Sequence, residues 1–446
     1  MPRHSKVHEQ ALSDQTLVLD NGAYTMKAGF ASPSPSVSDC VEIPNCIAKD
    51  RERTVYIGAD LDTAREFGEI IYRRPVEKGC LVSWEAEKEI WDHSFFGKSA
   101  KLQCDPHSAN LLLTEAPNVP ATLQSNCDQI VFEEYEFAAY HRCTGPSLNA
   151  YNDIALLFKD PTNASIPAEA PAECVLVVDS GFSHSTVTPV YRGRPIQQAI
   201  RRLDIGGKFL TNYMKEVVSI RHTNMMDDTH IMNQVKEDVC FVSKDLKADL
   251  ERVWKGRDKL KDRIGDEILV DYVLPDFTNY IRGFRRPHDP QLQVKRNKYG
   301  AVQGANGIME AVMTIGNERF TVPELLFHPA DIGMKVGGLP EVVLESMYAL
   351  PQALQAAMLS NILVIGGNVK LQNFTERLTA EIRQLAPAEV IVRVVEAPDP
   401  IKSTWLGGAR LAANRQLLKE VMVTRQDYQE YGTAWLSKKF ASGKAK

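Results

Sequence analysis

Apolar runs that end in turn-forming residues mark the start of the chain and recur in its middle. Near the start, Leu17–Leu19 is an apolar strand that stops at Asp20-Asn21-Gly22, and a second β-rich run continues to Phe30. Asn-Gly is a tight-hairpin signal, because both residues tolerate the positive φ angles that a two-residue turn requires. Alone, this segment predicts an ordinary hairpin in an antiparallel sheet.

The same pattern returns in the run Cys174–Tyr191. An apolar strand again ends in Asp-polar-Gly, here Asp179-Ser180-Gly181, and a second β-rich run follows. The two halves of the chain therefore open alike, which indicates an internal repeat. If a twofold-like axis relates the halves, the two turns face each other across a cleft.

Such a pair of turns suits phosphate binding. Successive backbone N–H groups in a tight turn form an anion-binding nest, and a small residue lets the backbone approach phosphate oxygens. Lys27 adds a point charge of the kind that commonly meets phosphate. Asp20 and Asp179 would repel phosphate unless a divalent cation lies between them, held directly or through waters. Magnesium needs only one or two carboxylates.

Two glycine pairs accompany helical patterns near the C-terminus. Gly366-Gly367 follows a buried strand and precedes an amphipathic helix, and Gly407-Gly408 precedes a second predicted helix. A helix N-terminus at either place would suit an anion or a nucleoside. Close packing of a strand against a helix explains either pair equally well.

Composition limits the class of protein. The chain has 446 residues, too many for one ordinary core, and its net charge of −5 argues against a surface coated in nucleic-acid-binding charge. The first residues have no apolar targeting segment, and no apolar stretch approaches the ~20 residues needed to span a bilayer. We therefore expect a soluble intracellular protein. Its eight cysteines form no CxxC pair and its histidines no HExxH motif, so no structural metal site is expected.

Nine motifs in fixed order resemble actin and the actin-related proteins along nearly the whole chain. They are DNGxxxxKAGF from Asp20, WEAEKEIWDHSFF from Trp84, LLLTEAP from Leu111, DSG from Asp179, RRLDIGGKFLTNYM from Arg201, VKEDVCFV from Val235, RFTVPELLFHP from Arg319, IGGN from Ile365 and WLGG from Trp405. The first turn, the short path from Pro44 to the segment Arg73–Trp84, and the chain length are most similar to one nuclear branch of the family. Members of that branch are subunits of chromatin remodellers that exchange a variant histone into nucleosomes.

The resemblance implies an α/β fold of the type shared by actin, Hsp70 and sugar kinases. Such a fold has two lobes, each with a mixed sheet, and a nucleotide cleft between them. It divides this chain into four subdomains. These are 1–41 with 75–160 and 403–446; 42–74, with a shortened outer loop; 161–205 with 335–402; and 206–334, with an extended basic insertion at about 255–311.

The resemblance also implies that the cleft holds ATP or ADP with Mg²⁺. Asp20 and Asp179 would hold the cation through waters, Asp204 and Gly207 would lie near the ribose, and Lys236 and Glu237 would flank the adenine. The remaining expected nucleotide-binding residues are Asn21, Gly22, Ala23, Tyr24 and Lys27 in the first turn, Ser180, Gly181, Phe182 and Ser183 in the second, and Gly366, Gly367, Asn368 and Lys370 at the later strand end.

Both turns depart from the family pattern. Ala23-Tyr24 replaces Ser-Gly in the first turn, and Phe182-Ser183 replaces Asp-Gly in the second. A bulky residue such as Tyr24 is a poor choice for a positive φ and is expected to narrow the pocket. A hydroxyl, a carboxylate and two flexible positions are lost from the phosphate end.

The family's water-positioning glutamine is also absent. Counted without gaps from Phe132-Glu133, its position falls on Gly145, and Gly145-Pro146 disfavours a regular helix. Phosphoryl transfer depends on positioning the attacking water, so we expect little or no hydrolysis. The alternative is a slipped register in which Gln129 substitutes.

A basic run in the fourth subdomain suggests a docking surface. It contains Arg282, Phe284, Arg285, Arg286, Lys295, Arg296 and Lys298. Docking of a partner subunit is favoured over a solvated loop, and contact with nucleosomal DNA is the weaker version. The outer loop of the second subdomain is reduced to a charged turn around Lys49–Arg53, which opposes filament formation.

Three functions compete. The favoured one is a non-enzymatic scaffold in a nuclear remodelling complex, bound to the remodeller's motor subunit and a small zinc-HIT subunit, as the resemblance implies. The second is an active ATPase or a sugar-kinase-like phosphotransferase, and the third is a polymerising actin.

Overall fold

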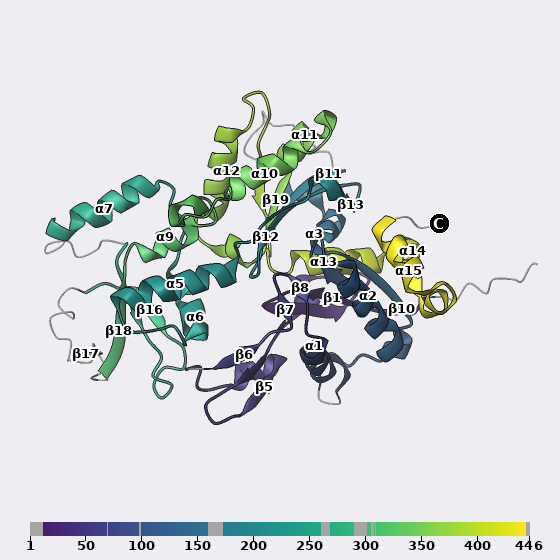
Figure 1. Cartoon of the computed structure of the whole chain (residues 1–446), viewed down its shortest axis with the longest axis horizontal. Helices are drawn as coiled ribbons and strands as arrows, with labels where there is room; N and C mark the ends of the chain where they lie inside the picture. The colour runs from purple at the N-terminus through teal and green to yellow at the C-terminus, as the bar shows by residue number, and fades with distance from the viewer. Residues whose placement is uncertain are drawn as a thin grey trace, which may run out of the picture.

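The computed structural model describes residues 12–68, 70–97, 100–158, 173–259, 268–289, 301–304, 307 and 309–442. Two mixed sheets, each covered by helices, form two lobes (Figure 1). The expected two-lobed α/β fold is confirmed, whereas the residue boundaries of the four subdomains stay a prediction. Among the described residues, no helix combines the length and apolar character that crossing a membrane requires.

The first sheet has the order β21-β10-β9-β1-β2-β3. Strand β1 pairs antiparallel with β2 and parallel with β9. Its side chains alternate between two cores: Leu17 and Leu19 pack with Trp91, whereas Val18 packs with Trp405 on the other face. The strands are β1 (Gln15–Asn21), β2 (Thr25–Phe30), β3 (Val41–Pro44), β9 (Ala109–Glu115), β10 (Ala139–Thr144) and β21 (Val423–Thr424).

Helices from both ends of the chain cover this sheet. Trp405 on α13 donates its indole N–H to the carbonyl of Val18 at 3.1 Å, which fixes the helix against β1. The helices are α1 (Trp84–Trp91), α2 (Ala121–Gln129), α3 (Gly145–Leu148), α4 (Ile154–Leu157), α13 (Ser403–Ala413), α14 (Arg415–Val421) and α15 (Arg425–Ser442).

The second sheet repeats the arrangement of the first. Strand β11 pairs antiparallel with β12 and parallel with β19, as β1 does with β2 and β9. The internal repeat in the sequence is therefore a repeat of strand pairing. The strands are β11 (Cys174–Ser180), β12 (Ser185–Tyr191), β13 (Arg194–Pro195), β14 (Arg201–Leu203), β19 (Ile362–Ile365) and β20 (Val394–Glu396).

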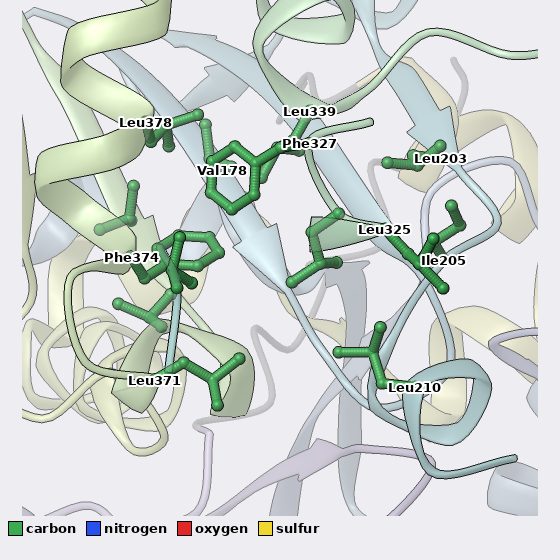
Figure 2. Close-up of a cluster of buried hydrophobic side chains, with 14 of the residues drawn as sticks. Val178, Leu203, Ile205, Leu210, Leu325, Phe327, Leu339, Leu371, Phe374 and Leu378 are labelled. Atoms are coloured by element: carbon green, nitrogen blue, oxygen red, sulfur yellow. The ribbon is translucent and has the colours of Figure 1, made fainter. Parts of the chain in front are cut away.

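The core of the second lobe lies between this sheet and its helices. Figure 2 shows Val178 of β11 near Phe327, Phe374 and Leu378, all of them buried. The helices of the second lobe are α5 (Gly207–Arg221), α6 (Thr229–Val239), α7 (Leu246–Lys259), α9 (Glu318–Glu324), α10 (Leu339–Tyr348), α11 (Gln352–Leu359) and α12 (Phe374–Leu385).

Two smaller sheets extend the lobes outward. One has the order β16-β15-β18-β17, and the other, below the lobes in Figure 1, has the order β5-β4-β6 and carries only a short turn between β4 and β5. A hairpin of β7 and β8 leads from β6 to α1. The strands are β4 (Ile47–Lys49), β5 (Val55–Ile57), β6 (Ile71–Arg73), β7 (Val76–Glu77), β8 (Cys80–Leu81), β15 (Val270–Val273), β16 (Phe284–Pro287), β17 (Ala301–Gln303) and β18 (Met309–Ile315).

The described part of the basic run is an edge strand and not a free arm. Arg282 pairs with Asp238 at 2.8 Å and Arg286 pairs with Glu310 at 2.6 Å, so two guanidinium groups are already held within the fold. Phe284 on β16 remains partly exposed beside Arg285. The other predicted docking residues, Lys295, Arg296 and Lys298, lie outside the described residues.

Candidate functional site

A cavity of about 510 Å³ lies between the lobes, where β1 and β11 end. Its volume is typical of a small-ligand site. Both turns line it, and so does every residue expected at a nucleotide except Ser180 and Asp204. The Ser180 hydroxyl is buried and accepts from the Asn368 amide at 3.1 Å, so it orients a lining residue. The Asp204 carboxylate is 70% exposed and pairs with Arg202 at 2.7 Å, so it does not line the cavity, and its place near a ribose stays a prediction.

The first turn needs glycine for space and not for its φ angle. None of residues 20–27 has a positive φ, so that expectation for Asn21, Gly22 and Tyr24 is wrong. Because three residues rather than two join β1 to β2, the connection does not require a positive φ. A Cβ on Gly22 would lie only 2.5 Å from the carbonyl oxygen of Thr25. The chain therefore folds tightly back at Gly22, beside the cavity.

A buried polar network holds the first turn in place. The Asn45 amide donates to Asn21 Oδ1 at 3.2 Å and to the carbonyl of Gly22 at 3.0 Å. Glu87 on α1 is fully buried, and it accepts from the Trp91 indole at 2.9 Å. Burial raises the pKa of Glu87 to about 7, although hydrogen bonds from Asn21, Trp91 and Asn45 partly oppose the shift.

The second turn is held by backbone contacts from the start of α5. The amide of Gly207 donates to the carbonyl of Gly181 at 3.0 Å, and that of Lys208 donates to the carbonyl of Phe182 at 2.8 Å, so the start of α5 packs directly on the turn. A Cβ on Gly206 would lie 2.6 Å from the amide nitrogen of His184. Gly206 was not among the expected residues, although the Gly-Gly pair that contains it was a signal.

The two later glycine pairs serve different purposes. Gly366 has a φ of 99°, lines the cavity, and would place a Cβ 2.4 Å from the carbonyl oxygen of Ser180. Gly407 and Gly408 lie inside α13 rather than before a helix, and a Cβ on Gly407 would lie 2.1 Å from the carbonyl oxygen of Leu148. The packing explanation therefore holds for the second pair.

Charges converge at the end of the cavity between the turns. Asp20 Oδ1 accepts from the Thr114 hydroxyl at 2.7 Å, and its Oδ2 lies 4.0 Å from the Lys27 ammonium. Burial, and next the negative charge of Asp20, raise the pKa of Asp179 to about 7, whereas Lys27 opposes this shift. Two carboxylates at the same end of a cavity are a suitable donor set for a water-bound Mg²⁺. Asp20 and Asp179 therefore fit the expected cation.

Helix α6 lines the cavity with Lys236 and Glu237, the residues expected to flank an adenine. The Lys236 ammonium is buried and donates to the carbonyl of Gly207, to Thr211 Oγ1 at 3.0 Å and to Asn233 Oδ1 at 2.9 Å. Burial lowers the pKa of this lysine. Lys236 therefore lines the cavity with its donors already used inside the protein, and Glu237 beside it contributes the carboxylate.

The position of the family's glutamine faces the cavity. A Cβ on Gly145 would lie 3.7 Å from Asp20 Oδ1. A short helix, α3, begins at Gly145 and carries Pro146 in its first turn, where proline is tolerated, so the expected absence of a helix is wrong. Gln129 is the last residue of α2 and is not among the residues that line the cavity.

Strand β9 supplies site residues that sequence reasoning missed. Thr114 and Glu115, in the LLLTEAP motif, line the cavity beside the first turn. The available signal was their position at the carboxyl end of a strand next to β1, where α/β folds gather ligands. His184 in the second turn and Thr404 on α13 also line the cavity without having been expected there.

Comparison with known proteins identifies the family. Residues 11–441 match the protein-family model described as Actin. The chain is 50% identical to "Actin-like protein arp6" of Emericella nidulans over 98% of this chain and 97% of the relative. It is 52% identical to the protein of the same name from Aspergillus fumigatus, over 97% and 96%, and 36% identical to "Actin-related protein 6" of Drosophila melanogaster, over 94% and 98%. As the nine motifs predicted, the chain belongs to the actin family, and these relatives place it with the proteins named actin-related protein 6.

Proposed function

We propose that this chain is a non-catalytic, actin-fold scaffold subunit of a nuclear chromatin-remodelling complex that exchanges a variant histone into nucleosomes. The observation that carries the proposal is the cavity itself. It keeps Asp20, Asp179 and Lys27 for a phosphate–Mg²⁺ group, but has Gly145 where the family positions the attacking water. A site that binds a nucleotide without orienting water holds it and does not turn it over.

In this proposal a bound nucleotide adds to the stability of the folded protein as a whole. Lys27 and the turn amides would bind the phosphates, Asp20 and Asp179 would order the waters of Mg²⁺, and Glu237 would flank the nucleoside. When bound, ATP with Mg²⁺ would link the two lobes through its charges. Because ligand bound only to the folded state stabilises that state by mass action, the nucleotide would act as a structural element.

The expected partners follow from the family resemblance. They are the remodeller's motor subunit and a small zinc-HIT subunit, with nucleosome contact as a further possibility and the nucleus as the location. The short β4–β5 turn supports a monomer within a complex rather than a filament. Pelleting at high protein concentration tests the hypothesis of a filament. Co-purification of the motor subunit and the zinc-HIT subunit tests the hypothesis of a scaffold.

The decisive experiment measures the nucleotide and its turnover on one preparation. The protein is purified under native conditions, its nucleotide is released by denaturation and identified by chromatography, and single-turnover hydrolysis is followed on the rest. Retained ATP without hydrolysis supports the proposal. ADP with sustained turnover would instead support an ATPase or a sugar-kinase-like phosphotransferase, although Phe182 occupies the place where a catalytic carboxylate would help.

We expect Lys27→Met to weaken ATP binding about 10- to 100-fold and to leave adenosine binding unchanged. Lys27 lies at the phosphate end, and a hydrogen bond to a charged group contributes about 1.5–3 kcal/mol. Isothermal titration with ATP and with adenosine measures both affinities. Lys370→Met, which removes a charge from the same cavity beside Gly367, is the control and should not distinguish the two ligands in this way. Equal losses for ATP and adenosine would place Lys27 outside a phosphate site.

Retention of a Mg²⁺-bound nucleotide is expected to fall about tenfold per pH unit below pH 7. Since the pKa of Asp179 is raised to about 7, the carboxyl is protonated below that pH and a cation must displace the proton. Nucleotide retention measured against Mg²⁺ concentration at pH 6, 7 and 8 gives the dependence. Asp179→Asn should remove it, and Asp204→Asn, an exposed carboxylate outside the cavity, should not.

A further inference from the structure

The two residues that depart most from the family pattern contact each other across the cleft. Tyr24 lies in the turn between β1 and β2 of the first lobe, and Phe182 lies in the turn between β11 and β12 of the second. Their ring centroids are 4.7 Å apart, with the planes inclined at 38°. Aromatic pairs at this separation attract each other beyond the area they bury. The two departures from the family pattern, Tyr24 and Phe182, therefore contact each other, which neither sequence segment shows alone.

Arg74 adds a cation to this ring pair. Its guanidinium carbon lies 4.8 Å from the centroid of the Tyr24 ring and 5.3 Å from that of Phe182. The same guanidinium donates at 3.3 Å to the carbonyls of Tyr24 and Asn45, which holds it over the rings. A guanidinium over an aromatic face is attracted by the electron density of the ring. One cation therefore contacts rings from both lobes.

Asn233 joins the hydroxyl of Tyr24 to the second lobe. Its side-chain amide donates to Tyr24 Oη at 3.2 Å and to Glu237 Oε1 at 2.8 Å. Burial raises the pKa of Tyr24 to about 12, so the phenol stays neutral. Tyr24 thus reaches from the first lobe to α6 as well as to Phe182.

Contacts farther out bring the same parts of the chain together. Tyr72 Oη lies 2.8 Å from His230 Nδ1 on α6, and the ring of Phe67 stacks on that of His230 at 4.2 Å. Arg202 of the second lobe donates to the carbonyl of Lys78 at 2.7 Å, in the hairpin of β7 and β8. Tyr72 and Lys78, which lie on either side of Arg74 in the sequence, therefore both contact the second lobe.

We propose that Tyr24, Phe182, Arg74 and Asn233 form an interlobe clamp that keeps the cleft closed whether or not a nucleotide is bound. The turns that carry Tyr24 and Phe182 both line the cavity, so the contact between these two side chains joins the lobes without any ligand. The clamp supplies attraction from the protein's own side chains. The clamp does not require that the cavity binds a nucleotide, so it is tested independently of the proposed function.

Hydrogen exchange on the nucleotide-free protein tests the clamp. Nucleotide is removed with EDTA and a phosphatase, and exchange is followed in peptides that cover β1–β2 and α6, with and without MgATP. We expect these peptides of the wild type to be protected to within about twofold in both conditions, a difference well under 1 kcal/mol. Tyr24→Ala and Phe182→Ala should each increase opening on the order of tenfold without nucleotide.

The double variant shows whether the rings act on each other. Since an aromatic pair contributes a coupling of roughly 2- to 12-fold, the combined effect should fall short of the product of the single effects by that factor. Tyr24→Phe keeps the ring and loses the bond to Asn233, and Phe182→Leu keeps apolar volume, so both remain informative if an alanine variant fails to fold. Tyr431→Ala, which disrupts the exposed pair of Tyr431 with Trp435 on α15, is the matched control.

Two results from the wild type and the double variant would overturn the clamp, and so would a third from the control. One is a nucleotide-free wild type that exchanges as fast as the double variant, since closure would then depend on the ligand. The other is a double variant whose increase in exchange equals the product of the increases in the two single variants, because Tyr24 and Phe182 would then act independently. Loss of protection in Tyr431→Ala would likewise show that any missing aromatic residue opens the cleft.

Discussion

Asp128→Ala is expected to lower the melting temperature by about 3–5 °C, because breaking a buried ion pair costs about 3–5 kcal/mol and each kcal/mol shifts the midpoint of a chain of 446 residues by about 1 °C. Asp128 on α2 is fully buried, and Arg142 on β10 is nearly so. The guanidinium donates through Nε to Asp128 Oδ1 at 2.9 Å and through Nη2 to Oδ2 at 3.2 Å, a two-point contact. Removing Asp128 leaves the buried guanidinium with Glu115 as its remaining carboxylate partner in a low-dielectric interior.

The loss should extend to the cavity wall. Arg142 Nη1 also donates to Glu115 Oε1 at 2.6 Å, and Glu115 lines the cavity at the end of β9. Without Asp128, Arg142 is held from one side only, so Glu115 and its neighbour Thr114 lose a fixed support. We therefore expect ligand binding to weaken together with stability.

Thermal unfolding followed by circular dichroism measures the effect, and a paired replacement separates charge from volume. Asp128→Leu combined with Arg142→Met replaces the pair by apolar side chains, and such replacements are often neutral. The double variant should therefore recover part of the melting temperature lost in Asp128→Ala, since Glu115 loses Arg142 but keeps its hydrogen bond from Gln124. Glu136→Ala, which disrupts an exposed pair with Arg425, is the control and should shift the midpoint little. A shift as small as that of the control would show that the buried pair contributes nothing.

The fold was predictable because its signals are local. Apolar runs that end in Asp-Asn-Gly and Asp-Ser-Gly indicate β1 and β11, and their likeness anticipated the repeated pairing with β2 and β12. The nine motifs then supplied the order of elements between them. Strand ends could therefore be placed at one cavity without any knowledge of side-chain contacts.

Contacts between distant segments were not predictable from these signals. Tyr24 and Phe182 were recognised separately as departures from the family, but 158 residues separate them and nothing local pairs their rings. Two short-range contacts were missed as well, that of Asp204 with Arg202 and that of the Lys236 ammonium with Asn233, because they depend on side-chain geometry. The backbone at Gly22 was misjudged because a three-residue connection removes the need for a positive φ. For Tyr24, Phe182 and Lys236 the residue lies at the cavity as expected, and only the partner of its side chain was missed.

Glu87→Gln should remove a pH dependence of stability between about pH 4.5 and pH 7. The pKa of Glu87 is raised from 4.5 to about 7 by burial. Below pH 4.5 the carboxyl is protonated in both the folded and the unfolded state. Between the two values only the folded state keeps the proton, so stability falls as the pH rises, by roughly 3 kcal/mol in total.

The hydrogen-bond network around Glu87 shows what a proton on its carboxyl does. Glu87 Oε2 and Asn45 Oδ1 are both buried acceptors without a partner among the described residues. Protonation turns the carboxyl into a donor within the network that holds Asn21 and the carbonyl of Gly22. Ionisation above pH 7 leaves an uncompensated charge directly beneath the first turn. A glutamine keeps the shape and one acceptor but cannot ionise.

Denaturant titrations of the wild type and of Glu87→Gln at intervals from pH 4 to pH 8 measure the difference in the free energy of unfolding. The advantage of the variant should grow through the window and level off above pH 7, where the wild-type carboxyl is ionised in both states. Glu89→Gln changes an exposed carboxylate on the same helix and should give a flat difference. Parallel profiles for Glu87→Gln and the wild type would mean that the buried carboxyl ionises without cost, and that Asn21, Asn45 and Trp91 already stabilise its charge within the fold.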